Sequence, residues 1–211
     1  MHGQGLQPVG LFGGSFDPPH MGHVALVHAA LDLLQLPELW VVPVGLPVHR
    51  ELSGRADGAR RLAWMRRIFS DEPYVVVQDW EVRAPEPTPT IDTLRRIRRE
   101  IPHLRPVLLL GSDAFAGIES WISYPDHIEL CDVAVFSRAG EPPLASHHGW
   151  QPVKIDAWRS SAGSGRLLQV APTLPEISAT ELRDRAVAGK SLAKWVPECV
   201  RQDVERAYTG S

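Results

Sequence analysis

The sequence predicts an α/β protein with a Rossmann-like, doubly wound and mainly parallel sheet that carries helices on both faces. Short apolar runs alternate with amphipathic segments of helical length, which is the pattern of strand–helix–strand units. The first apolar run ends in a glycine pair directly before a helix, and glycines give the backbone the freedom to turn there. These two observations favour this fold class over an all-helical or an all-strand one.

The individual elements follow in chain order. The apolar run Val9–Phe12 predicts a buried strand that Gly13-Gly14 ends,. The next segment, Met21–Leu36, has apolar residues at a spacing of three and four, and Pro37 ends this helix,. The later strands are predicted at Leu39–Val42, Tyr74–Gln78, Pro106–Leu110, Asp132–Phe136 and Arg166–Val170. The later helices are predicted at Ala59–Phe69, Ile91–Ile101, Ala179–Ala188 and Pro197–Tyr208.

The length and continuity of the chain favour one domain. A chain of 211 residues can form a single hydrophobic core,, and it contains no internal repeat and no clear linker. We therefore expect one domain over residues 1–211, whose C-terminal helical part spans about residues 177–208. The stretch Gly140–Gly165 has no clear periodicity, and the sequence leaves its role open.

Composition excludes several classes of protein. The formal net charge is −3 and the pI is about 6.3, which argues against a dedicated nucleic-acid partner or an acidic membrane surface. No apolar run approaches the roughly 18 residues of a membrane span, and Met1–Gln7 lacks the pattern of a signal peptide,. Two cysteines cannot form a disulfide framework,. We expect a cytoplasmic protein and leave its oligomeric state open, a homo-oligomer included.

The turn after the first strand contains the most informative residues, Gly13-Gly14-Ser15-Phe16-Asp17-Pro18-Pro19-His20-Met21-Gly22-His23. Two glycines after a strand let the backbone approach a ligand closely, as phosphate-binding turns require. The helix that follows directs its N-terminal N–H groups and the positive end of its dipole to the same place. His20 and His23 are three residues apart at the helix start, so both imidazoles can face a phosphate. Each residue taken alone also fits a glycine turn with solvated histidines.

A second helix start lies near the C-terminus. Ser178-Ala179-Thr180-Glu181 has the form of a capping box, in which Ser178 accepts a bond from the amide of Glu181 and the Glu181 carboxylate reaches back. The remaining N–H groups, the hydroxyls and Arg183 one turn further also suit a triphosphate. The structural and the phosphate-binding interpretations are compatible.

The first motif resembles the signature of the nucleotidyltransferases that carry His-x-Gly-His on a Rossmann-like sheet. Within them the chain is similar to the bacterial nicotinate-nucleotide adenylyltransferases, which make the dinucleotide precursor of NAD from ATP. The resemblance continues in order along nearly the whole chain, at Pro47–Arg50, Thr90–Leu94, Gly111–Asp113, Trp121, Ser137–Gly140 and Ile177–Arg183.

This resemblance implies a role for each matching residue. His20 and His23 are the implied catalytic pair that holds the α-phosphate and the bridging oxygen of ATP. The implied ATP-binding residues are Gly13, Gly14, Ser15, Phe16, Gly111, Asp113, Ser178, Thr180 and Arg183. The implied mononucleotide-binding residues are His49, Thr90, Ile91, Trp121, Ile122 and Arg138. Among the latter, Trp121 would stack on the pyridine ring, whereas Arg138 and His49 would face the mononucleotide phosphate.

The implied reaction is the direct attack of a mononucleotide phosphate oxygen on the α-phosphorus of ATP, with pyrophosphate leaving and no covalent intermediate. A phosphate monoester has a second pKa of about 6 and is largely dianionic at neutral pH, so the nucleophile needs no general base. The predicted partners are therefore ATP and nicotinate mononucleotide. We predict Mg²⁺ bound with the ATP phosphates, and no metal site made by the protein alone.

Two other functions remain as alternatives. A pantetheine-phosphate adenylyltransferase shares the His-x-Gly-His motif, but Thr90–Leu94 and Trp121 resemble the nicotinate branch. A non-catalytic nucleotide sensor would not need both histidines, Thr180 and Arg183. One departure bears on specificity: Pro89 stands where the family has a tyrosine, and proline has no N–H to offer. The preference for nicotinate over nicotinamide mononucleotide is therefore open, as is the role of His49.

Overall fold

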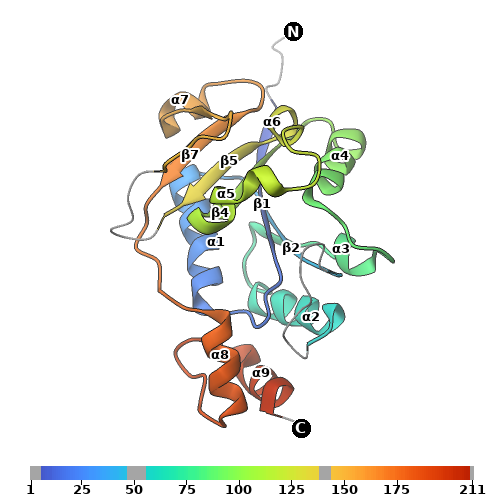
Figure 1. The fold of residues 1–211 in the computed structure, drawn as a ribbon, viewed down its shortest axis with the longest axis vertical. Coiled ribbons are helices and arrows are strands. Elements are labelled where there is room, and N and C mark those ends of the chain that lie inside the picture. Colours follow the sequence, from blue (N-terminus) through green and yellow to red (C-terminus); the bar gives the residue numbers. More distant parts are fainter. Residues whose placement is uncertain (1–5, 47–55, 138–143, 210–211) are drawn as a thin grey trace. The chain divides into compact units, whose positions relative to one another are not determined.

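A computed structural model describes residues 6–46, 56–137 and 144–209 of the chain (Figure 1). In this part the sheet has the strand order β3-β2-β1-β4-β5-β7-β6. Parallel pairing joins β1 to β4, β4 to β5, β5 to β7 and β7 to β6. The strands are β1 (Gln7–Gly14), β2 (Leu39–Pro43), β3 (Val75–Val77), β4 (Leu104–Gly111), β5 (Asp132–Phe136), β6 (Gln151–Pro152) and β7 (Arg166–Val170). The predicted α/β class and all six predicted strands are confirmed.

The helices also follow the predicted order. They are α1 (Met21–Leu34), α2 (Gly58–Ile68), α3 (Trp80–Arg83), α4 (Thr90–Glu100), α5 (Ser112–Ala116), α6 (His127–Leu130), α7 (Ile155–Arg159), α8 (Ala179–Val187) and α9 (Glu198–Thr209), with a 3₁₀ turn at Ile118–Ser120. Helix α1 ends two residues before the predicted Leu36, because Gln35 adopts a left-handed backbone with φ of 50°,. The sequence analysis did not predict β6 or the short helices α3, α5, α6 and α7.

The chain forms two compact units, each of which is described by itself. The first unit comprises Met1–Phe12, Ala29–Leu39 and Pro89–Thr173. The second unit comprises Gly13–His28, Trp40–Thr88 and Leu174–Ser211. The expectation of one domain over the whole chain stays a prediction.

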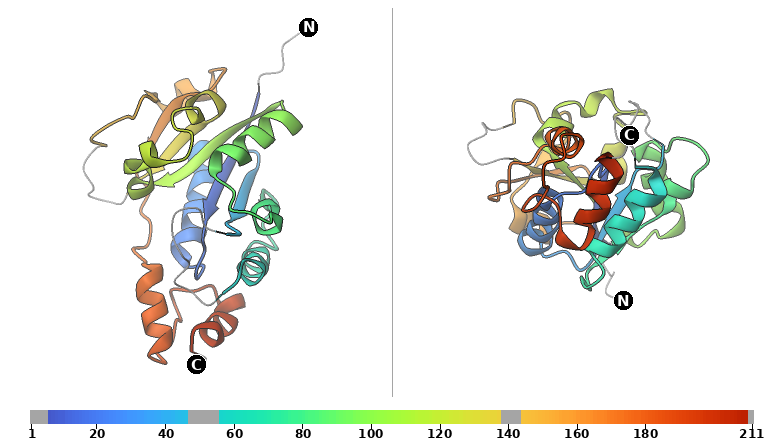
Figure 2. Two further views of the ribbon diagram at one scale, coloured as in Figure 1. Left: turned by 45° about the vertical axis from the view of Figure 1, so that its right-hand side comes forward. Right: turned by 90° about the horizontal axis from the view of Figure 1, so that it is seen from below.

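The second unit has a core formed by α2, α8 and α9. Asp57 caps α2, since its side chain accepts a hydrogen bond of 2.7 Å from the amide of Arg60,. Figure 2 shows α9 lying alongside α2 in the view from below. Their contact includes the rings of Trp64 and Tyr208, whose centroids are 6.4 Å apart. Leu182 from α8 and Val204 from α9 are buried in the same cluster, so apolar packing fixes both C-terminal helices within this unit.

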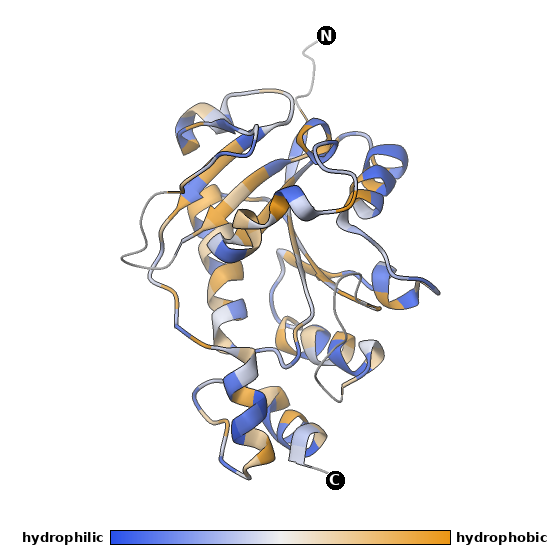
Figure 3. Cartoon of the chain, viewed as in Figure 1, coloured by the Kyte–Doolittle hydropathy of each residue, from blue (hydrophilic) through white to orange (hydrophobic). Residues whose placement is uncertain are grey.

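The first unit is organised around the buried strands β4, β5 and β7. Figure 3 shows these strands as predominantly hydrophobic along their length, and β5 is buried at all its residues. Helix α4 buries Ile91, Leu94 and Ile97, while its other face carries charged side chains. That division is the amphipathic pattern from which the helix was predicted.

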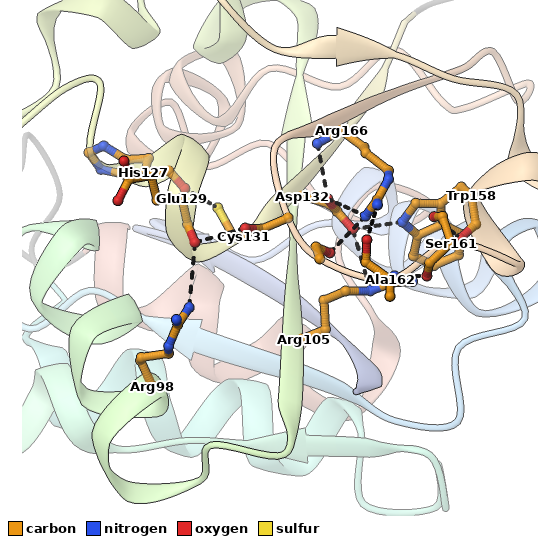
Figure 4. A network of polar contacts seen from close by, with 12 residues as sticks. Arg98, Arg105, His127, Glu129, Cys131, Asp132, Trp158, Ser161, Ala162 and Arg166 are labelled. Atoms are coloured by element: carbon orange, nitrogen blue, oxygen red, sulfur yellow. Dashed lines mark hydrogen bonds and ion pairs between the residues drawn. The ribbon is translucent and has the colours of Figure 1, made fainter. Parts of the chain in front are cut away.

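A buried polar network occupies the beginning of these strands (Figure 4). Asp132 is fully buried and accepts hydrogen bonds from Trp158 Nε1 at 2.8 Å and from the amide of Arg166 at 3.0 Å. The guanidinium of Arg105 lies 3.5 Å from the same carboxylate and donates to the Ser161 carbonyl at 2.6 Å. Burial raises the pKa of Asp132, although these donors act in the opposite direction,. The network connects β4 and β5 with α7 and the turn after it.

Replacing Asp132 with alanine is expected to lower the free energy of unfolding by about 3–5 kcal/mol, the range for breaking a buried ion pair. The variant removes the carboxylate that forms an ion pair with Arg105 and leaves the Trp158 N–H without its acceptor. Equilibrium urea unfolding of the two proteins measures the difference. Asp156→Ala is the matched control, because this exposed carboxylate pairs with Arg159 at the surface, where such pairs contribute about 0–1 kcal/mol. Equal losses for both variants would contradict the expectation.

Candidate active site

The residues singled out from the sequence fall into two groups. The second unit contains Gly13, Gly14, Ser15, Phe16, His20, His23, Ser178, Thr180 and Arg183. The first unit contains Thr90, Ile91, Gly111, Asp113, Trp121 and Ile122. His49 and Arg138 lie outside the described residues. The structure therefore brings together the two motifs that were predicted to bind phosphate, as the next contacts show.

The glycine turn, defined here as residues 13–17, is shaped by one buried aromatic ring. Phe16 is 1% exposed and has a left-handed backbone with φ of 49°, a conformation uncommon for a bulky residue. A Cβ added to Gly14 would lie only 3.0 Å from the Phe16 ring. Gly22 is restricted in the same way, since its added Cβ would lie 3.0 Å from Nδ1 of His20. A larger residue at either position would therefore push the neighbouring ring by a few tenths of an ångström.

The two histidines of the motif form a stacked pair. Their ring centroids are 3.6 Å apart with an interplanar angle of 21°. The Phe16 and His23 rings also pack edge to face, with their centroids 5.0 Å apart. The amide of His20 donates to Nδ1 of His23 at 3.1 Å, which resembles the returning bond of a capping box. Because Nδ1 is an acceptor there, the proton of neutral His23 is on Nε2. His23 can therefore donate one hydrogen bond from Nε2 to a ligand.

Burial keeps both imidazoles uncharged at neutral pH. Desolvation lowers the pKa of His20 from 6.5 to about 4,. Burial, and after it the neighbouring His20, lowers the pKa of His23 well below its usual value. Nδ1 of His20 is buried and has no hydrogen-bond partner among the described residues. The pair consequently offers neutral hydrogen-bonding groups rather than two positive charges.

One part of the expected helix start differs in the structure. The amide of Met21, the first residue of α1, donates to the carbonyl of Trp195 at 2.7 Å. The prediction that the N-terminal N–H groups of this helix face a ligand is therefore wrong for Met21. This hydrogen bond instead connects the start of α1 to the segment before α9.

The second motif joins the first one through an arginine. Arg183 of α8 donates to the Asp17 carbonyl at 2.6 Å and to Thr180 Oγ1 at 3.0 Å. Ser178 caps α8, since its hydroxyl accepts from the amide of Glu181 at 3.4 Å. Among the described residues the Glu181 carboxylate returns no bond to Ser178, because this side chain is exposed to solvent. Half of the predicted capping box is therefore present.

Sequence analysis missed two buried residues that contact the glycine turn. Arg61 donates to the Ser15 carbonyl at 2.5 Å, and the Tyr208 hydroxyl donates to the Asp17 carboxylate. Only the position of Arg61 carries a local signal in the sequence. Arg61 lies on the same helical face as the buried Leu62 and Met65, where a charge is unexpected, whereas the C-terminal Tyr208 has no local pattern that connects it to residue 17.

In the first unit, the candidate residues follow β4 and begin α4. Gly111 ends β4 and precedes α5, which contains Asp113. Gly111 pairs in register with Phe136, so the carboxyl ends of β4 and β5 meet at one edge of the sheet. Thr90 and Ile91 are the first residues of α4, and the Ile91 side chain is buried. Amides in the first turn of a helix lack intrahelical acceptors, which leaves these two positions suited to an anionic group.

Trp121 is partly buried and rests against other aromatic rings. The rings of Trp121 and His127 pack edge to face, with centroids 5.8 Å apart and an interplanar angle of 72°. The His127 ring also stacks on the Tyr124 ring, with centroids 6.3 Å apart. Ile122 is 44% exposed directly beside it. A partly exposed, aromatic-supported indole can stack on a flat ligand ring.

Comparison with known proteins identifies a matching family and relatives of this chain. Residues 11–185 match the model of the family described as cytidylyltransferase-like. Two curated bacterial relatives carry the name "Probable nicotinate-nucleotide adenylyltransferase". The one from Thermotoga maritima is 33% identical over 202 residues, which cover 96% of this chain and 93% of the relative. The one from Laribacter hongkongensis is 36% identical over 195 residues, which cover 90% of this chain and 88% of the relative.

The chain belongs to the cytidylyltransferase-like family. Within this family it groups with the nicotinate-nucleotide adenylyltransferases, as the motifs predicted. A solved structure with the same fold is the Plasmodium falciparum nicotinic acid mononucleotide adenylyltransferase complexed with NaAD. Its TM-score is 0.74 at 17% identity, with 95% of each chain covered. The described residues of this family member include no helix that is long and apolar enough to cross a membrane.

The protonation state of the histidine pair can be tested directly. Between pH 8 and pH 6 neither His20 nor His23 is expected to gain a proton in the free protein, because their pKa values are lowered. Long-range ¹H–¹⁵N NMR spectra should show His23 with its proton on Nε2. Assignment of the two rings by His20→Asn and His23→Asn variants identifies the signals. A titration midpoint near 6.5 for both rings would contradict the burial argument.

Proposed function

We propose that this protein transfers the adenylyl group of ATP to nicotinate mononucleotide, giving deamido-NAD and pyrophosphate as a step of NAD biosynthesis. The observation that carries the proposal is the stacked, uncharged pair His20 and His23 beside the glycine turn. The similarity to curated relatives over nearly the whole chain supports it.

In this proposal the second unit binds the ATP phosphates. The amides of the glycine turn and Nε2–H of His23 would donate to the α-phosphate and the bridging oxygen. Ser178 and Thr180 are exposed at the start of α8 and would bind the β- and γ-phosphates together with Arg183. The Arg183 guanidinium keeps donors beyond the two bonds described above, because it carries five N–H groups. Preorganised donors of this kind stabilise charge that develops during phosphoryl transfer.

The first unit would bind the two nucleoside parts. Gly111 and Asp113 would contact the ribose of ATP, and Trp121 would stack on the pyridine ring. The amides of Thr90, Ile91 and Ile122 would donate hydrogen bonds to the nicotinate carboxylate. Arg138 and His49 remain candidates for the mononucleotide phosphate by family resemblance alone.

No general base is needed, because the attacking phosphate is largely dianionic at neutral pH. The described residues include no group of three or more His, Cys, Asp or Glu side chains that could hold a metal ion. The donors around the glycine turn fit phosphate oxygens rather than a cation. Mg²⁺ would therefore enter as part of the substrate MgATP, bound by the phosphates themselves. A cytoplasmic location and the oligomeric state stay predictions.

The experiment that tests this function is pyrophosphate release from ATP with three separate acceptors: nicotinate mononucleotide, nicotinamide mononucleotide and phosphopantetheine. Nicotinate mononucleotide should give the highest kcat/KM. The ratio of kcat/KM for the nicotinate and the nicotinamide form measures the preference of this chain, which carries Pro89. Turnover of phosphopantetheine alone would favour the pantetheine-phosphate alternative. ATP binding without pyrophosphate release from any acceptor would favour a nucleotide sensor.

His23→Ala is expected to lower kcat by about 10²- to 10³-fold, the range for removing one transition-state donor. The fold should persist, because His23 is not part of the apolar cluster that packs α2, α8 and α9 together. Steady-state kinetics with nicotinate mononucleotide give kcat, and circular dichroism checks the fold. His103→Ala is the control, because this histidine is exposed and lies outside the candidate site. A His23→Ala enzyme that retains more than about a third of the wild-type kcat would exclude the proposed role.

A further inference from the structure

The backbone of the glycine turn must offer N–H groups, not carbonyl oxygens, to a phosphate. Its carbonyls therefore need donors on the inner side of the turn. Three of them accept hydrogen bonds within the second unit: Gly14 from the amide of Val44, Ser15 from Arg61 and Asp17 from Arg183. Of these two arginines, Arg61 is fully buried, with an exposure of 0%.

The guanidinium of Arg61 connects three separate segments of the second unit. Nη1 donates to the Ser15 carbonyl at 2.5 Å, Nη2 to the Gly45 carbonyl at 3.1 Å and Nε to the Ala56 carbonyl at 3.2 Å. A planar fork of donors can serve three acceptors in fixed directions at once, which a lysine ammonium cannot reproduce. The position of Ser15 is thereby tied to the residues that follow β2 and to those that precede α2.

The chemistry of this contact is unusual for a purely structural arginine. Among the described residues no carboxylate accepts a hydrogen bond from Arg61, and its three acceptors are backbone carbonyl oxygens. Burial lowers the pKa of Arg61, and the negative charge of Asp17 acts in the opposite direction. A buried guanidinium without a hydrogen-bonded anion is costly to keep. A buried guanidinium in contact with the glycine turn is explained if the turn must be held in one conformation for a ligand.

Tyr208 holds the same turn at its other end. Its hydroxyl donates to the Asp17 carboxylate, and both residues are 3% exposed. Burial, and after it Asp17, raises the pKa of Tyr208, so the phenol stays protonated and remains a donor. The C-terminal helix α9 is thus connected to the motif that precedes α1.

We propose that Arg61 and Tyr208 are positioning residues for adenylyl transfer, which hold the Ser15 carbonyl and the Asp17 carboxylate so that the amides of the glycine turn face the ATP phosphates. Neither residue contacts the substrates in this proposal. The kinetic part of the inference rests on the proposed function, whereas the part concerning ATP binding does not.

The test compares Arg61→Lys and Tyr208→Phe with the wild-type chain. Both variants are expected to reduce kcat/KM for ATP, Arg61→Lys by about 10- to 100-fold, since a small misplacement of binding groups can cost that much. The KM for nicotinate mononucleotide should stay within about twofold in both, because no contact of the first unit changes. Thermal unfolding of each protein sets an assay temperature at which all of them are folded.

Arg105→Lys is the matched control. Arg105 is also a buried arginine that donates to a backbone carbonyl, but it lies in the first unit, in the network of Figure 4. It should lower the melting temperature as Arg61→Lys does and leave kcat/KM for ATP within about twofold. This comparison separates a loss of stability from a loss of positioning, because only the latter changes the ATP constants of a folded enzyme.

The possible outcomes decide the proposal. A fall in kcat/KM for ATP in Arg61→Lys and Tyr208→Phe, but not in Arg105→Lys, supports it. Wild-type constants in both variants, or an equal fall in Arg105→Lys, overturn it. If Arg61→Lys fails to fold, Tyr208→Phe decides by the same constants.

A separate measurement distinguishes failure of the inference from failure of the proposed function. Isothermal titration with α,β-methylene-ATP measures nucleotide affinity without turnover. If the wild-type chain releases no pyrophosphate with nicotinate mononucleotide, the proposed function fails, and the titration still tests the positioning residues. Weaker binding by Arg61→Lys and Tyr208→Phe than by wild type and Arg105→Lys then supports the inference, and equal binding overturns it.

Discussion

A turn that binds an anion through its amides depends on where its carbonyl groups point. In the glycine turn, side-chain donors of the second unit bind two of these carbonyls: the buried Arg61 donates to Ser15 and the partly exposed Arg183 donates to Asp17. The Phe16 ring fills the space beside Gly14 and holds the backbone in its left-handed conformation. Side chains from α2, α8 and α9 thus contact the glycine turn through hydrogen bonds from Arg61, Arg183 and Tyr208.

The parts of the structure that the sequence predicted are those with a local cause. The strand β5 has the predicted bounds Asp132–Phe136, because the apolar run Val133–Phe136 within it favours a buried strand. Ser178 begins α8 through its own side chain, which is a contact over three residues. The juxtaposition of the two motifs that are predicted to bind phosphate needed the family resemblance, since the bond from Arg183 to Asp17 spans 166 residues.

The parts that could not be predicted depend on distant partners. Helix α7 has five residues, too few to be stable alone, and its Trp158 is fixed by the Asp132 carboxylate from β5. The same holds for Arg61. With three lysines among 22 basic residues, arginine is the ordinary positive residue of this chain, so its type at one position carries little information. Its burial and its three carbonyl partners appear only when the chain is folded.

The stacking of His20 on His23 places a condition on the chemistry of the site. Two imidazolium rings with centroids 3.6 Å apart would repel each other strongly in a site of low polarity. The lowered pKa values remove that conflict at neutral pH. Positive charge that contacts the glycine turn is then supplied by the guanidinium groups of Arg61 and Arg183,. A neutral Nε2–H can donate to a phosphate oxygen without first taking up a proton. In the proposed reaction, the pH dependence of kcat/KM for the mononucleotide would then follow the second ionisation of its own phosphate, and the histidines would not titrate in the same range.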